Sequence, residues 1–263
     1  MSVFKLMRIV MLLSILFVIV VSAWMTEKRM AAWERPILVT VYPIVADDRA
    51  STRRFAEALN EASFDPVNAF FTRASVPYGF TVTPAVRIQL AEVSDEKPPK
   101  VPAQFDTAAI GWWSLKMRWW AFMQSLRDGL VTPDIQMFVL FHSLNGNDEV
   151  GISVGMRKGR YGIVKAYARD SLADRNLVVF THELLHVLGA TDKYVLTTGE
   201  PLYPEGYADP NQRPLFPQAR AEIMGGRIPL SSIASAEPES LAECHIGQVT
   251  AQEIGFFDKL NAH

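Results

Sequence analysis

The sequence has a single cysteine, Cys244, so it has neither an intramolecular disulfide nor a Cys-x-x-Cys pair for zinc binding or thiol exchange. It also lacks an excess of charge, since 26 Lys plus Arg residues face 28 Asp plus Glu residues and leave a formal net charge of −2. No overall positive field exists to hold polyanionic nucleic acid, and we expect no nucleic-acid partner. Histidine is scarce as well, with five residues: His142, His182, His186, His245 and His263. Any metal site must be built from these histidines and from carboxylates.

The overall composition is that of an ordinary globular protein. Hydrophobic residues make up 49% of the chain, with 16 prolines and 15 glycines, which excludes disordered, collagen-like and coiled-coil classes. No internal repeat is evident. Residues 36–263 are long enough to form one large domain with its own core.

The amino terminus contains an uncharged run, IVMLLSILFVIVVSAWMT, of 18 residues from Ile9 to Thr26. As a helix rising about 1.5 Å per residue it would be roughly 27 Å long, close to the thickness of the bilayer hydrocarbon core. Lys5 and Arg8 precede the run and favour a cytoplasmic amino terminus. We therefore expect residues 1–35 to form a transmembrane signal anchor with a short juxtamembrane segment. The protein would then cross the membrane once, and the membrane would be one of its partners.

A cleaved signal peptide is the alternative, because Val21-Ser22-Ala23 places small residues after the apolar region. The anchor would leave residues 36–263 extracytoplasmic and attached to the membrane. Cleavage would instead release them as a secreted or periplasmic protein.

Four segments of the remaining chain have the pattern of β-strands. Residues 37–44 are rich in β-branched side chains, residues 86–93 alternate between apolar and polar, and residues 135–143 are almost continuously apolar. Residues 151–168 are typical of a strand interrupted by glycines. Because residues 53–62 predict a helix after the first strand, we expect an α+β fold with a sheet of four or five strands.

The segment 111–129 contains four of the six tryptophans and predicts a further helix. Its apolar residues cover more than half of the helical circumference, which favours a mostly buried helix. An interfacial helix at the membrane surface is the alternative, because tryptophan and basic side chains suit the headgroup region.

One stretch, VVFTHELLHVLGATDKY, predicts chemistry. His182 and His186 are four residues apart, so on a helix both imidazoles share one face and can bind one ion. Gly189 permits a turn that ends the helix, and this turn can carry Asp192 to a third ligand position. Two imidazoles and a carboxylate leave a fourth position for water, the arrangement of a catalytic zinc site. Glu183 is then placed to act as general base on that water.

This motif resembles the extended zinc-binding motif of the metzincin metallopeptidases, in the snapalysin-like form that has aspartate in place of the third histidine. The resemblance implies a Met-containing turn beneath the metal, for which Met224 in AEIMGG is the candidate. It also implies a twisted mixed sheet packed on the zinc-binding helix, with a C-terminal subdomain that holds the Met-turn and a closing helix. In such a fold the segment 151–168 would present an edge to the backbone of a peptide substrate.

The predicted function is a zinc-dependent endopeptidase that binds one catalytic Zn²⁺ and acts on a peptide or protein substrate. Two alternatives stay open: a catalytically silent peptide-binding or scaffolding protein on the same fold, and a zinc hydrolase of non-protein amides. Intact Glu183 argues against the silent protein, because a degenerate enzyme would readily lose its general base.

Several other residues are candidates of second rank. Tyr194 is a candidate for oxyanion stabilisation or for a hydrogen bond to a metal ligand. His245, beside Cys244, and His142 are rivals to Asp192 as third ligand, although we favour packing roles for both histidines. His263 ends the chain.

Two segments near the carboxyl terminus complete the predictions. Residues 201–218 contain five prolines, form no long helix, and are a candidate wall of the substrate pocket. Residues 250–260 predict the closing helix, with Thr250 as its N-cap and Glu253 at the third position.

Overall fold

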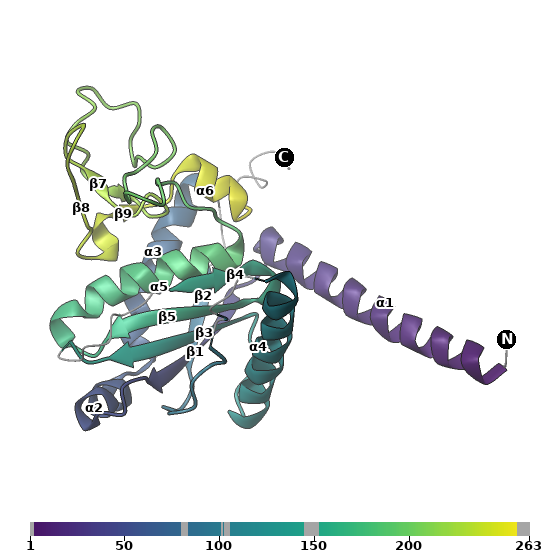
Figure 1. Cartoon of the computed structure of the whole chain (residues 1–263). Helices are drawn as coiled ribbons and strands as arrows, with labels where there is room; N and C mark the ends of the chain where they lie inside the picture. The colour runs from purple at the N-terminus through teal and green to yellow at the C-terminus, as the bar shows by residue number, and fades with distance from the viewer. Residues whose placement is uncertain (1–2, 80–83, 101, 103–105, 145–152, 257–263) are drawn as a thin grey trace.

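The computed structural model of the chain describes residues 3–79, 84–100, 102, 106–144 and 153–256 (Figure 1). The α-helices are α1 (Val3–Ala32), α2 (Ala50–Ala58), α3 (Asp65–Ser75), α4 (Thr107–Arg127), α5 (Ala173–Leu188) and α6 (Gln248–Glu253). The strands are β1 (Ile37–Val45), β2 (Val86–Leu90), β3 (Ile135–His142), β4 (Val154–Met156), β5 (Tyr161–Tyr167), β6 (Ala221–Glu222), β7 (Ile228–Pro229), β8 (Ser235–Ala236) and β9 (Cys244–His245). The 3₁₀ turns are η1 (Glu61–Phe64), η2 (Val76–Tyr78), η3 (Arg157–Gly159), η4 (Asp170–Leu172) and η5 (Leu241–Glu243).

A five-stranded sheet with the order β2-β1-β3-β5-β4 is the centre of the fold. β1 pairs in parallel with β2 and β3, and β3 pairs in parallel with β5. β4 lies at the edge and runs antiparallel to β5, with Gly155 opposite Gly162. The chain is therefore a mixed α/β protein with a mostly parallel sheet, consistent with the predicted fold class.

The sequence located three of these strands correctly. The predictions at 37–44, 86–93 and 135–143 are confirmed as β1, β2 and β3. The single interrupted strand predicted over 151–168 is instead the antiparallel pair of β4 and β5, because the 3₁₀ turn η3 and Arg160, at φ 55°, reverse the chain between them.

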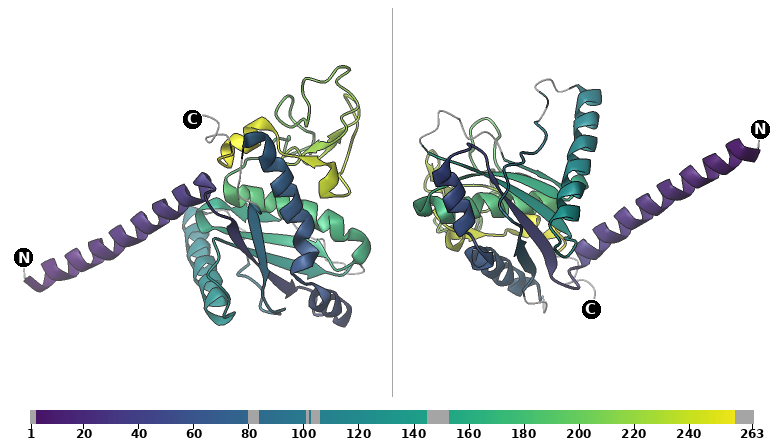
Figure 2. Two further views of the ribbon diagram at one scale, coloured as in Figure 1. Left: turned by 180° about the vertical axis from the view of Figure 1, so that it is seen from behind. Right: turned by 90° about the horizontal axis from the view of Figure 1, so that it is seen from below.

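The two faces of the sheet carry separate apolar cores, with helices on both sides (Figure 2). Successive side chains of a strand point to opposite faces, so Val41 enters one core and Tyr42 enters the other. Helices α3 and α5 cover the face of Val41, and α4 covers the face of Tyr42. α5 packs on β4 and β5, which places it beside the edge of the sheet.

Helix α4 is only half buried, so the prediction of a mostly buried helix is wrong for one of its faces. Trp113, Met117 and Ala121 pack on the sheet. Five large apolar side chains on the other face are each more than half exposed: Trp112, Leu115, Trp119, Phe122 and Leu126. An apolar arc wider than the sheet can cover leaves part of the arc outside the core.

The prediction of a transmembrane anchor is also wrong, and with it that of a single-pass membrane protein. The expected helix is present as α1, but over the residues that the structure describes no helix is both long enough and apolar enough to cross a bilayer. An uncharged run of this length is not sufficient for a membrane span, because insertion depends on the summed transfer free energy of the whole helix. The alternative of a cleaved signal peptide stays a prediction, as does the division at residues 35 and 36.

The end of α1 is attached to the body of the protein. Arg29 forms an ion pair with Asp134 at 2.6 Å, and Trp33 is 1% exposed. The indole Nε1 of Trp33 donates a hydrogen bond to the carbonyl of Ile254 at 2.7 Å. Figure 1 shows the rest of α1 extending away from this attachment.

The segment that follows α5 lies over that helix, shown in green and yellow in Figure 1. It contains the short pairs β6 with β9 and β7 with β8, followed by α6. The closing helix is thus present, but Thr250 is not its N-cap, because α6 begins at Gln248 and Gly247 is the N-cap. The Thr250 hydroxyl donates to Glu222 instead, at 2.7 Å. Residues 257–260 of the predicted helix, like His263, lie outside the described residues.

Candidate metal centre

Helix α5 presents its two histidines at the edge of the core. Phe180, Leu184 and Val187 are buried on the face that packs against the sheet. The side chains of His182 and His186 are 15% and 19% exposed, and they follow one another by one helical turn. Their orientation is therefore set by which face of α5 is apolar.

The chain turns back directly after α5. Gly189 is the C-cap residue at φ 118°, a left-handed conformation that residues with a side chain rarely adopt. Its amide donates to the carbonyls of Leu185 and His186. As the sequence predicted, this turn brings Asp192 back to the two histidines.

Three ligand atoms converge on one point. His182 Nε2 and His186 Nε2 are 3.1 Å apart, and Asp192 Oδ1 lies 3.2 Å and 3.1 Å from them. Within the described part of the chain, these three residues are the one group of histidine, cysteine and carboxylate side chains close enough to hold a metal ion. Donor atoms around a tetrahedral zinc ion at about 2.0–2.1 Å lie roughly 3.3 Å from one another, close to these separations.

The hydrogen bonds of both imidazoles fix their tautomers. His182 Nδ1 lies 2.9 Å from the carbonyl oxygen of Ile223, and His186 Nδ1 lies 2.9 Å from that of Ala190. A carbonyl oxygen only accepts, so each Nδ1 carries the proton and donates it. In a neutral ring Nε2 is then left with a lone pair, the state that binds a metal.

The centre of the cluster therefore requires a positive charge. Two imidazole lone pairs and a carboxylate oxygen lie in mutual contact, and Asp192 Oδ1 accepts no hydrogen bond from the described residues. Burial alone would lower the pKa of His186, but Asp192 and the carbonyl of Ala190 raise it above its usual value. Burial likewise opposes the Asp192 carboxylate, yet the two imidazoles hold its pKa well below the usual range. A divalent cation meets this requirement for positive charge, so the three residues fit a zinc ion.

Tyr194 lies beside the third ligand. Its ring centroid is 6.3 Å from that of His182, and its phenol lies near the Asp192 carboxylate. Burial, together with the nearby Asp192 carboxylate, raises the pKa of Tyr194 to about 12. The phenol therefore keeps its proton at neutral pH beside Asp192.

Glu183 is buried next to the three ligand residues without being one of them. Its side chain has a free acceptor, because Oε2 makes no hydrogen bond to a described residue. Burial raises the pKa of the Glu183 carboxyl, and the imidazoles of His182 and His186 partly offset this effect. A carboxylate with a raised pKa and an unused oxygen is suited to taking up a proton.

The edge strand β4 contacts α5 through Gly155. A Cβ atom at this position would lie 2.6 Å from the Cβ of His186 and still closer to the carbonyl oxygen of Glu183. The Gly155 amide also favours the ionised form of Glu183 and so partly offsets the effect of burial on the pKa of this carboxyl. Only glycine allows this approach, and the sequence offered no sign of the contact beyond the glycine itself.

The predicted Met-turn lies against the same site. Met224 is fully buried, and its carbonyl accepts a hydrogen bond from the amide of Lys193 at 2.8 Å. Glu222, also fully buried, accepts hydrogen bonds from the amides of Gly225 and Gly247. The turn thus supports the histidine side through Ile223 and the aspartate side through Lys193.

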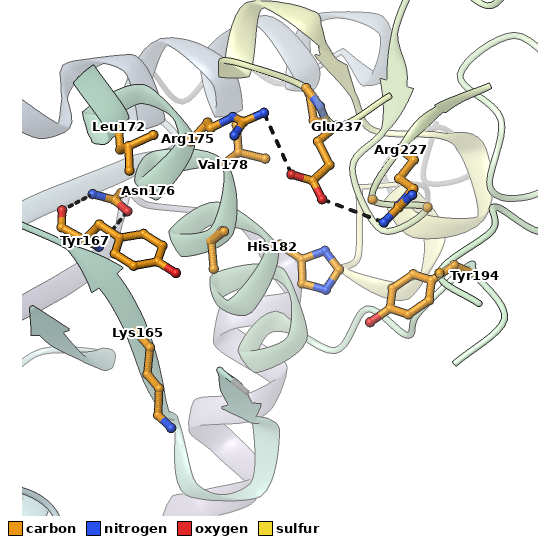
Figure 3. A pocket seen from close by; sticks show the side chains of 15 residues that line it. Lys165, Tyr167, Leu172, Arg175, Asn176, Val178, His182, Tyr194, Arg227 and Glu237 are labelled. Carbon is orange, nitrogen blue, oxygen red and sulfur yellow. Dashed lines mark hydrogen bonds and ion pairs between the residues drawn. The ribbon is translucent and has the colours of Figure 1, made fainter. Parts of the chain in front are cut away.

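A pocket of about 410 Å³ opens beside His182 (Figure 3). Its lining includes Val178 and Val179 from α5, Lys165 and Tyr167 from β5, and Arg227 and Glu237 from the C-terminal segment. Figure 3 shows Glu237 between Arg175 and Arg227, at 3.8 Å and 3.7 Å from them. Residues 201–218 do not line this pocket, so the wall predicted there is instead formed around Arg227 and Glu237.

The rival ligands lie elsewhere. His142 ends β3, and His245 lies in β9, where its carbonyl accepts from the amide of Ile223 at 2.9 Å. Burial lowers the pKa of His245 and raises that of the buried Cys244 thiol to about 12. Neither histidine belongs to the metal-binding group among the described residues.

No protein-family model matches the chain, and no curated protein matches it significantly. The resemblance to the metzincins therefore stays a prediction that rests on the residues of the motif.

Proposed function

We propose that the protein is a zinc-dependent endopeptidase. The convergence of His182 Nε2, His186 Nε2 and Asp192 Oδ1 within 3.2 Å carries this proposal, because such a group of donors fits a catalytic zinc ion. A structural zinc site is closed by four protein ligands, whereas here three protein ligands leave one position for chemistry.

The arrangement around the site supports a metzincin-like fold for this enzyme. The helix with the two histidines packs on a mixed sheet, β4 is an antiparallel edge strand, and Met224 is buried in a turn that contacts His182 and Lys193. We interpret the C-terminal segment with β6–β9 and α6 as the subdomain with a closing helix that such a fold would have.

Bound zinc would supply a Lewis acid and lower the pKa of water to about 7. Glu183 then takes the proton from the attacking water, and the same carboxyl returns it to the amine that leaves. The raised pKa of Glu183 favours its uptake of that proton. The Gly155 amide favours the carboxylate form of Glu183, and the phenol of Tyr194 stays protonated beside Asp192.

The edge of the sheet supports a peptide as the substrate. β4 pairs with β5 on one side, and no described strand pairs with its other side. The main-chain N–H and C=O groups on that side of β4 can hydrogen-bond an extended peptide, which would then form a further strand of the sheet. Side chains of such a peptide would reach the pocket of about 410 Å³ beside His182.

Replacement of Glu183 by Gln tests the proposal. The variant should keep its zinc and its fold, while cleavage of a diverse peptide library falls roughly 10²–10⁴-fold, the usual contribution of a general acid or base. Zinc is measured by metal analysis and cleavage by mass spectrometry. Glu57→Gln, an exposed position on α2, is the matched control and should cleave at the wild-type rate.

Two results would contradict the proposal. Equal cleavage by wild type and Glu183→Gln would remove Glu183 from the mechanism. A zinc-loaded wild type that binds library peptides without cleaving any of them would favour the scaffolding alternative.

A further inference from the structure

The third ligand lies between two residues that share one partner. The carboxylate of Glu253 accepts hydrogen bonds from the Thr191 amide at 3.0 Å and from the Thr191 hydroxyl at 2.6 Å. The ammonium group of Lys193 forms an ion pair with the same carboxylate at 2.8 Å. Glu253 therefore holds the residues immediately before and after Asp192.

The ammonium end of this ion pair is buried, whereas the side chain of Glu253 is 25% exposed. Lys193 is 3% exposed, and Glu253 is the one carboxylate within ion-pair distance of it among the described residues. Lys193 also donates to the carbonyl and hydroxyl of Thr191 at 2.8 Å and 2.7 Å. A buried charge that loses its partner is strongly unfavourable, so these groups are held together.

Glu253 lies in α6, and tertiary contacts hold both ends of this helix. At the carboxyl end of α6, the carbonyl of Ile254 accepts the hydrogen bond from Trp33 at 2.7 Å. At the amino end of α6, Glu222 accepts a hydrogen bond from the Gly247 amide at 3.0 Å. The carboxylate of Glu253 is thus a fixed point against which the loop of Asp192 is placed.

The other main-chain contacts of the loop lie at its two ends, at Ala190 and at Lys193. The Lys193 amide is held by the carbonyl of Met224 at 2.8 Å, and the turn at Gly189 fixes the other end of the loop. Neither contact fixes Thr191 or the direction in which the Asp192 side chain leaves the backbone. The contacts of Glu253 with Thr191 supply that constraint.

We propose that Glu253, acting through Thr191 and Lys193, is a positioning residue that holds Asp192 in the metal-binding position. The inference rests on the proposed zinc site, but it does not require peptidase activity. It assigns to α6 a part in metal binding in addition to closing the fold.

Zinc affinity of the full chain tests this role directly. In Glu253→Gln we expect the dissociation constant for zinc, measured by competition with a chelator, to rise about 10–100-fold, the usual loss when a partner of a metal ligand is removed. Glu239→Gln is the matched control, because Glu239 forms an ion pair of the same 2.8 Å length with Arg175 but is 69% exposed. The control should keep the wild-type affinity.

Cobalt provides a readout that a general loss of stability would not change. The visible absorption of bound Co²⁺ reports the ligand set, so Glu253→Gln should shift the spectrum towards that of Asp192→Ala. An unchanged spectrum together with wild-type zinc affinity would overturn the proposal. If wild type binds zinc through Asp192 but cleaves nothing, the proposed function fails while the positioning role survives.

A milder variant decides the matter if Glu253→Gln does not fold. Thr191→Val removes only the hydroxyl that donates to Glu253 and accepts from Lys193. The folded Thr191→Val protein should bind zinc more weakly than wild type. Unchanged affinity in this variant would overturn the proposal.

Discussion

The two sides of the metal centre depend on different kinds of contact. His182 and His186 come from adjacent turns of α5, and the helix itself sets their separation. Asp192 comes from the loop after α5, whose position depends on Met224 in the C-terminal segment and on Glu253 in α6. One side is therefore local in the chain, and the other depends on packing between distant segments.

Even the local side is completed by a distant contact. The proton of His182 Nδ1 is donated to Ile223, which lies 41 residues further along the chain, whereas that of His186 is donated to Ala190, four residues away. The comparison indicates that α5 alone can offer two histidines but cannot fix the tautomer of both. We expect metal affinity to follow the integrity of the C-terminal segment.

Removal of a metal ligand should cause the largest loss of zinc affinity. The loss should be similar for a ligand from α5 and for the ligand from the loop. His186→Ala and Asp192→Ala should each weaken zinc binding by more than the roughly 10–100-fold typical of a supporting residue. His142→Ala and His245→Ala are the controls and should keep the metal. Loss of zinc in His245→Ala with retention in Asp192→Ala would show that the ligand assignment is wrong.

The contact between β4 and α5 can be broken by a single methyl group. Because a Cβ at Gly155 would lie 2.6 Å from that of His186, Gly155→Ala should destabilise the fold by about 1–3 kcal/mol and should displace β4 from His186 and Glu183. Thermal unfolding and peptide cleavage measure the two effects.

Gly111→Ala is the matched control for Gly155→Ala. A Cβ at this position in α4 would meet nothing within 4 Å, so the substitution should stabilise the helix by up to about 1 kcal/mol. Similar stability changes in both variants would argue against a close approach at Gly155.

The smallest effect concerns pH and the C-terminal segment. Burial lowers the pKa of His245 in the folded state, so folding favours the neutral ring. The neutral His245 ring therefore contributes to stability above the unfolded-state pKa of about 6.5. This contribution is lost as the pH falls towards the pKa that His245 has in the folded state. The free energy of unfolding should therefore decline from neutral pH into mild acid, and His245→Gln should flatten this decline in denaturant titrations. An identical slope in the variant would assign the decline to other groups.

The sequence was informative where local geometry decides the structure. Period-two alternation and apolar runs located β1, β2 and β3, and the four-residue spacing placed both histidines on one face of α5. The glycine at 189 indicated the turn that returns Asp192. These features depend on residues within one or two turns of one another.

The sequence was misleading for two helices whose environment was predicted from the number of their apolar residues. The uncharged run in α1 was interpreted as a membrane span, and the wide apolar arc of α4 was interpreted as buried on most sides. Composition cannot indicate which arc of a helix finds a partner, because the partner is chosen by the packing of the whole fold.

The residues of the motif and the order of the elements were determined by the sequence itself, because side-chain type and spacing fix which atoms a helix can present. Only the tertiary structure decided which groups surround them. The carbonyls of Ile223 and Ala190 and the amide of Gly155 belong to the main chain, so no residue type identifies them. Glu253 acts on Thr191 across 62 residues, a separation that only the folded chain closes.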